Sequence, residues 1–150
     1  EIAPTVAQIA RTPELFSFVS TCTPNAPTHL GDARIVLEQQ TDHTFDTLVI
    51  AAYSSDAVPV HLTTIEALEV YLDRLDQNGV LVFHISNRYY DVPGAEPEPG
   101  DTRSLVVMMA RSEAAFGSLL ADSRWMALES DGKRIWTDDF ADLLSIMIWN

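Results

Sequence analysis

Apolar residues along the chain gather in short runs that polar segments and turn residues separate. Residues 47–52 are nearly all apolar, which is the pattern of a strand covered on both faces. Residues 80–85 and 104–109 repeat this pattern. A helical segment lies between the first two runs, so strand, helix and strand form a βαβ unit with parallel pairing. The sequence therefore predicts an α/β fold.

The helix between the first two strands has clear sequence boundaries. Thr63 and Glu66 match a capping box, in which each side chain accepts from the other residue's free backbone N–H. Asn78-Gly79 supplies a stop. The apolar stripe of this helix consists of Ile65, Leu68, Leu72 and Leu75.

The other predicted elements are shorter. Helices are expected over residues 4–11, 33–40 and 112–121, short strands over 28–30 and 134–136, and a proline-rich surface loop over 93–101. Thr137, Asp138 and Asp139 offer caps for a last helix. One side of that helix would carry Phe140, Leu143, Leu144 and Met147.

The segment Tyr53-Ser54-Ser55-Asp56 follows the first buried strand directly. Ligands of doubly wound sheets bind outside the carboxyl ends of the strands, so this polar loop is a candidate site. Its serines have no nucleophile elbow and no nearby base, which disfavours a serine hydrolase.

Composition narrows the range of partners. The chain has 150 residues, the size of one domain, and a formal net charge of -13. Binding to nucleic acid is not expected, because that binding depends on clustered Lys and Arg. An acidic surface suits a cationic substrate such as a polyamine, although it is also the ordinary surface of a solvated protein.

Cysteine and histidine usage disfavours disulfides and metals. Cys22 is the only cysteine, and the four histidines show no metal-ligand spacing, so no metal site is predicted. No apolar run approaches the length of about 20 residues that a membrane span needs. We expect a cytoplasmic location, either as a separate protein or as the soluble part of a larger membrane protein.

Five motifs in order carry a family likeness. They are EIAP at residues 1–4, GDAR at 31–34, YSSDAVPVHLT at 53–63, HISNRY at 84–89 and WTDDF at 136–140. Together they resemble spermidine synthase-like proteins, the polyamine aminopropyltransferases of the S-adenosylmethionine-dependent methyltransferase superfamily. The resemblance covers nearly the whole chain. It implies one domain over residues 1–150 with a Rossmann-like class I methyltransferase fold, a mostly parallel sheet with flanking helices.

The resemblance assigns a nucleoside site to three residues. Glu1 resembles the acid that accepts hydrogen bonds from the ribose hydroxyls, and its alternative role is an exposed terminal charge. Asp32 resembles the residue that binds the adenine amino group, and Ala33 supplies the neighbouring backbone amide. Asp32 can also be a helix N-cap, and both roles can coexist. The implied co-substrate is decarboxylated S-adenosylmethionine or S-adenosylmethionine.

The resemblance assigns the amine side of the site to the loop after the first strand. Asp56 resembles the second acid of the family's gate loop, which positions the cationic diamine through charge-assisted hydrogen bonds. Tyr53 would line the same pocket. The alternatives are a plain turn for Asp56 and a packing role for Tyr53.

The chain departs from the family pattern in three places. Ala51 stands where the family has an Asp that helps to deprotonate the attacking amine, and Ala3 replaces a second Asp. The first strand with its glycine-rich turn, and part of the C-terminal region, have no counterpart in this sequence. We expect a reduced sheet, which either further sequence before residue 1 completes or a second copy of the chain completes in a homo-oligomer.

Three functions follow from these patterns. The first is aminopropyl transfer to a diamine, with activity weakened by Ala51. The second is a non-catalytic remnant of the fold that acts as an interaction or oligomerisation module. The third is transfer of a methyl group from S-adenosylmethionine.

Overall fold

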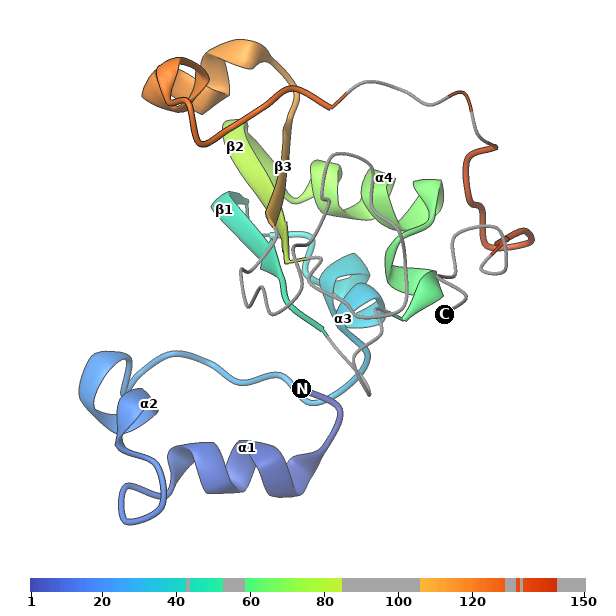
Figure 1. The fold of residues 1–150 in the computed structure, drawn as a ribbon. Coiled ribbons are helices and arrows are strands. Elements are labelled where there is room, and N and C mark those ends of the chain that lie inside the picture. Colours follow the sequence, from blue (N-terminus) through green and yellow to red (C-terminus); the bar gives the residue numbers. More distant parts are fainter. Residues whose placement is uncertain (43, 53–58, 85–105, 129–131, 133, 143–150) are drawn as a thin grey trace, which may run out of the picture. The chain divides into compact units, whose positions relative to one another are not determined.

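The structure is a computed structural model that describes residues 1–42, 44–52, 59–84, 106–128, 132 and 134–142. The chain forms two compact units, Glu1–Thr41 and Asp42–Asn150, whose elements are coloured along the sequence in Figure 1. The single domain expected from the length stays a prediction. No described helix is long and apolar enough to cross a membrane.

The first unit consists of three short helices. They are α1 (Pro4–Arg11), α2 (Ser17–Cys22) and α3 (Ala33–Gln39), which Figure 1 labels. Pro4 opens α1, where its missing N–H costs no hydrogen bond. The predicted helices over 4–11 and 33–40 are confirmed, the second ending one residue earlier.

The strand predicted over residues 28–30 is wrong, because these residues form no strand. Their backbone nevertheless pairs with the first residue of the chain. The Glu1 amino group donates to the His29 carbonyl at 3.0 Å, and the Gly31 N–H donates to the Glu1 carbonyl at 3.0 Å. These two bonds enclose Leu30 in the manner of a parallel pair. A single pair of residues does not make a ladder, so the segment is extended without being a strand.

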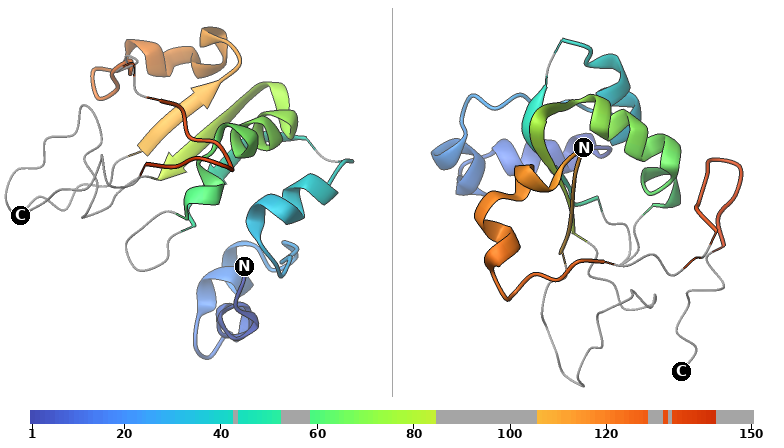
Figure 2. Two further views of the ribbon diagram at one scale, coloured as in Figure 1. Left: turned by 90° about the vertical axis from the view of Figure 1, so that its right-hand side faces the viewer. Right: turned by 90° about the horizontal axis from the view of Figure 1, so that it is seen from above.

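The second unit contains a small sheet. Its strands are β1 (Phe45–Ile50), β2 (Leu75–His84) and β3 (Val106–Ala110), and its helical elements are η1 (Val60–Leu62), α4 (Ile65–Asp73) and η2 (Glu113–Ala121). The strand order is β1-β2-β3, and both views in Figure 2 show α4 beside β2. β1 and β2 are parallel, as the βαβ unit predicts. β2 and β3 are antiparallel, so the described sheet is mixed and the predicted mostly parallel sheet is not found among its strands.

The predicted two-sided burial of the first strand is wrong. Ile50 is its only buried residue, and Val49 is 57% exposed. β1 lies at one edge of the described sheet, where it has a neighbouring strand on one side alone. The central strand β2 instead buries Gly79, Leu81 and Phe83, which alternate along it and share one face.

The core of the second unit joins this face to α4. Its buried apolar residues are Ile50, Leu62, Ala67, Tyr71, Leu75, Leu81 and Phe83. The ring centroids of Tyr71 and Phe83 lie 5.9 Å apart with their planes tilted by 56°, within the range of distances that favours contact between aromatic rings. The buried Tyr71 hydroxyl donates to the Leu62 carbonyl at 3.2 Å, so the polar end of the ring has a partner.

The helix α4 begins one residue later than the capping box predicts, and it buries a different face. Thr64 is the N-cap, with its hydroxyl accepting from the Ala67 N–H at 3.3 Å. Thr63 closes η1 instead, because its N–H and hydroxyl both donate to the Val60 carbonyl. Of the predicted stripe, Ile65 is 36% exposed, Leu68 and Leu72 are half-buried, and the buried Leu75 belongs to β2, so the buried positions of α4 are Ala67 and Tyr71.

The stop predicted at Asn78-Gly79 is also wrong, because α4 ends at Asp73 and Gly79 lies within β2. The pairing of β1 with β2 is irregular here. Phe45 faces Leu75 and Thr47 faces Val80, so β2 accommodates extra residues between these two pairs. Gly79 lies against the β1 backbone at this irregularity, and a Cβ atom there would meet the Phe45 carbonyl oxygen at 2.7 Å.

Gly79→Ala is expected to lower the free energy of unfolding by about 1–3 kcal/mol, the usual cost of overpacking. The added methyl would approach backbone atoms of Phe45 and Asp76, which cannot rotate away as a side chain can. Urea denaturation measures the change. Gln77→Ala, at an exposed position of the same strand, should stay within about 0.5 kcal/mol of the unsubstituted protein. Equal effects of both substitutions would contradict the close approach at Gly79.

Several predictions for the C-terminal part of the chain differ from the structure or lie outside the described residues. The helix predicted over 112–121 is the 3₁₀ element η2, which Gly117 interrupts with a φ of 53°. Residues 134–136 form no strand, and Thr137 and Phe140 instead close a turn. Asp138 and Asp139 lie in that turn and do not start a helix. The predicted loop 93–101, and Leu143, Leu144 and Met147 of the last helix, lie outside the described residues.

Candidate functional site

The predicted site residues fall into three groups. Tyr53 and Asp56 lie outside the described residues. Glu1, Asp32 and Ala33 belong to the first unit, and Ala51 belongs to the second.

The backbone brings Glu1 next to the motif that contains Asp32. The Gly31 N–H donates to the Glu1 carbonyl, and Asp32 is the next residue along the chain. Gly31 has a φ of 141°, in the region that favours glycine, and a Cβ there would meet the Val36 side chain at 3.1 Å. The glycine of the GDAR motif thus permits the chain to turn from the extended segment into α3.

The Glu1 carboxylate is held by the backbone at the start of α1. Its Oε1 accepts from the Ala3 N–H at 2.8 Å. Ala3 is the N-cap of α1 and contributes no side-chain cap. Glu1 is exposed, so a ligand can approach its carboxylate from solvent.

Asp32 is the N-cap of α3. Its Oδ1 accepts from the N–H groups of Arg34 at 3.0 Å and Ile35 at 3.2 Å, which confirms the capping interpretation. Ala33 is the first residue of α3. The cap fixes the orientation of the carboxylate at the beginning of this helix.

Asp32→Ala is expected to lower the stability of α3 by about 0.5–2 kcal/mol, because two backbone N–H groups lose their acceptor. Asp32→Asn should have little effect, since asparagine is an equally good N-cap. Amide hydrogen exchange of residues 34–39 measures both changes. Equal protection in the alanine and asparagine variants would contradict the capping role.

Ala51 directly follows β1 and is exposed. It therefore lies at the carboxyl end of a strand that is parallel to its neighbour, the place at which ligands bind in sheets of this kind. A methyl group neither accepts nor donates a proton. The exposed residue at this end of β1 therefore has no acid–base chemistry of its own.

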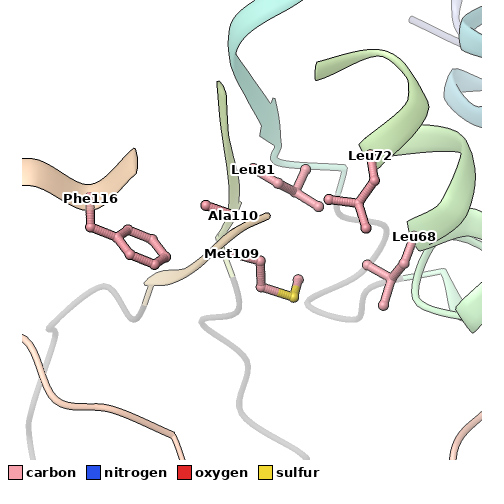
Figure 3. A pocket seen from close by; sticks show the side chains of 6 residues that line it. All are labelled: Leu68, Leu72, Leu81, Met109, Ala110 and Phe116. Carbon is pink, nitrogen blue, oxygen red and sulfur yellow. The ribbon is translucent and has the colours of Figure 1, made fainter. Parts of the chain in front are cut away.

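A cavity of about 320 Å³ lies in the second unit, and no predicted site residue is among those that line it (Figure 3). Its lining comes from α4, β2, β3 and η2 and consists of Leu68, Leu72, Leu81, Met109, Ala110 and Phe116. None of these side chains can form a hydrogen bond or carry a charge that would orient a nucleoside or a diamine. The cavity is therefore not the predicted site.

The charged groups of the described residues bear on metal binding and on ion pairing. No cluster of three or more His, Cys, Asp or Glu side chains that could hold a metal ion occurs among the described residues. The Arg124 guanidinium hydrogen-bonds to the Asp122 carboxylate and lowers the pKa of that group, and both side chains lie at the exposed end of η2. This pair does not involve a predicted site residue.

The structure gives the WTDDF motif a contact that the sequence did not predict. Residues 136–140, here called the clasp turn, are closed by two hydrogen bonds between Thr137 and Phe140, of 2.8 and 3.1 Å. The Arg134 guanidinium lies 3.7 Å from the centre of the Phe140 ring. The turn therefore has internal contacts that favour its shape.

The clasp turn binds the first residues of α4 through three hydrogen bonds. The Ile65 N–H donates to the Trp136 carbonyl at 2.9 Å. The Thr64 hydroxyl donates to Asp138 Oδ1 at 2.8 Å, and the Asp138 N–H donates to Glu66 Oε2 at 3.0 Å. These contacts span more than 70 residues of sequence. Capping patterns report only residues that are close in sequence. The sequence therefore predicted Thr63 as the partner of the Glu66 carboxylate, whereas the structure gives it the Asp138 N–H.

Comparisons with known proteins identified no relative of this chain. No model of a known protein family matches the chain, and no curated protein or solved structure matches it either. The similarity to spermidine synthase-like proteins therefore rests on the five motifs and their order.

Proposed function

We propose that the chain is a spermidine synthase-like protein that binds the nucleoside of decarboxylated S-adenosylmethionine through Glu1, Asp32 and Ala33. The acceptor is a diamine, bound with the help of Asp56 and Tyr53. Transfer of the aminopropyl group is slow, because Ala51 cannot accept the proton that the amine must lose.

The observation that carries this proposal is the backbone pairing of Glu1 with the segment before Asp32. A nucleoside presents ribose hydroxyls at one end and an adenine amino group at the other, so its recognition needs two acceptors on neighbouring segments. The bonds from Glu1 to His29 and Gly31 place the two acidic residues on such neighbouring segments. Ionised carboxylates are pure acceptors and suit both groups of donors.

The proposed reaction explains why Ala51 matters. The amine nitrogen forms a bond to the aminopropyl carbon next to the sulfonium, and the carbon–sulfur bond breaks. The electron pair of that bond stays on sulfur, which leaves as neutral 5'-methylthioadenosine. Before this attack the protonated diamine must lose a proton, because only a neutral amine nitrogen has a free electron pair, and the product then keeps the positive charge as a secondary ammonium. A positioned base contributes about 10²–10⁴-fold to such a proton transfer, and alanine at position 51 contributes none.

Calorimetric titration with 5'-methylthioadenosine tests the nucleoside site. We expect binding to the unsubstituted chain and at least about tenfold weaker binding to Asp32→Asn, which keeps the helix cap but loses the charge-assisted hydrogen bond to the adenine amino group. Glu14→Gln removes one charge at an exposed position of the same unit and should bind as the unsubstituted chain does. No heat at millimolar nucleoside would contradict the proposal.

The second candidate function is a non-catalytic interaction or oligomerisation module. Ala51 favours it, because the position for a proton acceptor at the end of β1 carries a methyl group. Formation of any aminopropyl product from putrescine would eliminate this candidate. A monomer in solution scattering would contradict its oligomeric form. Stronger heat with S-adenosylmethionine than with its decarboxylated form would instead favour a methyltransferase.

A further inference from the structure

The start of α4 contains two overlapping caps. In the structure, Thr64 is the N-cap and has an extended backbone, with a ψ of 160°. The sequence also contains the capping box of Thr63 and Glu66, in which Thr64 would be the first helical residue. Thr64 cannot be extended and helical at once, so the two caps exclude each other.

The two caps also use different partners for Thr63. As an N-cap, its N–H would donate to the Glu66 carboxylate, and its hydroxyl would accept from the Glu66 N–H. In the structure its N–H and hydroxyl donate to the Val60 carbonyl at 2.8 and 2.9 Å and close η1. A change of cap would therefore open η1.

The clasp turn favours the observed cap. It accepts the hydrogen bonds of Thr64 and Ile65 and donates one to Glu66. Thr64 is only 1% exposed, so its buried hydroxyl would lose its hydrogen-bond partner Asp138 if the turn left. Without the turn, each cap supplies a hydroxyl for one helix N–H, and the capping box adds the Glu66 carboxylate. The balance then shifts toward Thr63.

We propose that α4 has two alternative starts and that the clasp turn selects between them. With the turn bound, the helix starts at Ile65 with Thr64 as its cap. With the turn released, the helix starts at Thr64 with Thr63 as its cap, and η1 opens. Glu66 belongs to both states, because its carboxylate binds Asp138 in one and Thr63 in the other. This switch goes beyond the proposed function and does not depend on it.

The switch is tested with Asp138→Ala in the full chain. This variant loses the acceptor of the Thr64 hydroxyl, so we expect the Cα and Cβ chemical shifts of Thr64 to change from extended to helical values. Asp139→Ala is the matched control, because Asp139 is an exposed neighbour in the same turn. It should leave the shifts of Thr64 unchanged.

A pair of stability measurements tests the same switch independently. Thr63→Ala should change the unfolding equilibrium constant little in the unsubstituted protein, where Thr63 is not the N-cap of α4. In the Asp138→Ala background the same change should raise that constant about fivefold, the typical value of a lost N-cap. Equal effects in the two backgrounds would overturn the switch.

Thr64→Val repeats the test without changing the clasp turn. Valine keeps the shape of the buried side chain but has no hydroxyl. It therefore loses the hydrogen bond to Asp138 Oδ1 and the hydrogen bond from the Ala67 N–H. Residue 64 should again take helical shifts. An extended residue 64 in both variants would overturn the proposal. So would complete unfolding of both, because the clasp turn would then be a requirement of the fold and not a selector between two states.

Discussion

Replacing Leu81 by alanine is expected to lower the free energy of unfolding by about 2–5 kcal/mol. Leu81 lies on the central strand, where it pairs with Leu48 of β1 and Met109 of β3. Its side chain is 0% exposed, so truncation removes buried apolar atoms and leaves a void that rigid neighbours fill poorly. Chemical denaturation monitored by circular dichroism measures the loss.

Leu120→Ala is the matched control for this experiment. It removes the same atoms from a side chain that is 61% exposed in η2, and the change should stay within about 0.5 kcal/mol. If the free energy of unfolding fell no more in Leu81→Ala than in Leu120→Ala, the core would not depend on the packing of β2. The Leu81 variant should also enlarge the cavity beside it, since Leu81 lines that cavity.

The parts of the fold that the sequence predicted depend on local patterns. The apolar runs around β1 and β2, with a helix between them, were sufficient to predict their parallel pairing. Pro4 and Asp32 marked the starts of α1 and α3, because each satisfies a local requirement of a helix N-terminus.

The wrong predictions share a physical cause. The antiparallel direction of β3, the start of α4 at Ile65 and the place of Gly79 inside β2 all depend on contacts between distant segments. Capping and periodicity report only neighbours along the chain. Gly79 fits a helix stop as well as a close approach of two strands, and only the Phe45 carbonyl distinguishes the two.

The sequence likewise predicted the local features of the candidate site and missed the contacts between distant segments. Asp32 caps α3 as its helix-capping pattern indicates, whereas the sequence did not predict the pairing of Glu1 with residues around Leu30. The contact of Asp138 with Thr64 and Glu66 was missed, because nothing within the WTDDF motif indicates a partner more than 70 residues away.

Ala51→Asp is expected to raise aminopropyl transfer from decarboxylated S-adenosylmethionine to putrescine by about 10²–10⁴-fold, the usual contribution of a positioned base. The new carboxylate would stand at the carboxyl end of β1, at an exposed position where the substitution should change stability by less than about 0.5 kcal/mol. Release of 5'-methylthioadenosine measures the rate.

Ala51→Asn separates proton acceptance from a mere change of shape. Asparagine has nearly the size of aspartate and can hydrogen-bond the amine, but it cannot take the proton. We expect the asparagine variant to transfer no faster than the unsubstituted chain. If aspartate and asparagine gave equal rates while 5'-methylthioadenosine still bound, the nucleoside site would stand and the role of position 51 as a proton acceptor would not. The chain would then be a nucleoside-binding protein whose acceptor chemistry does not involve the end of β1.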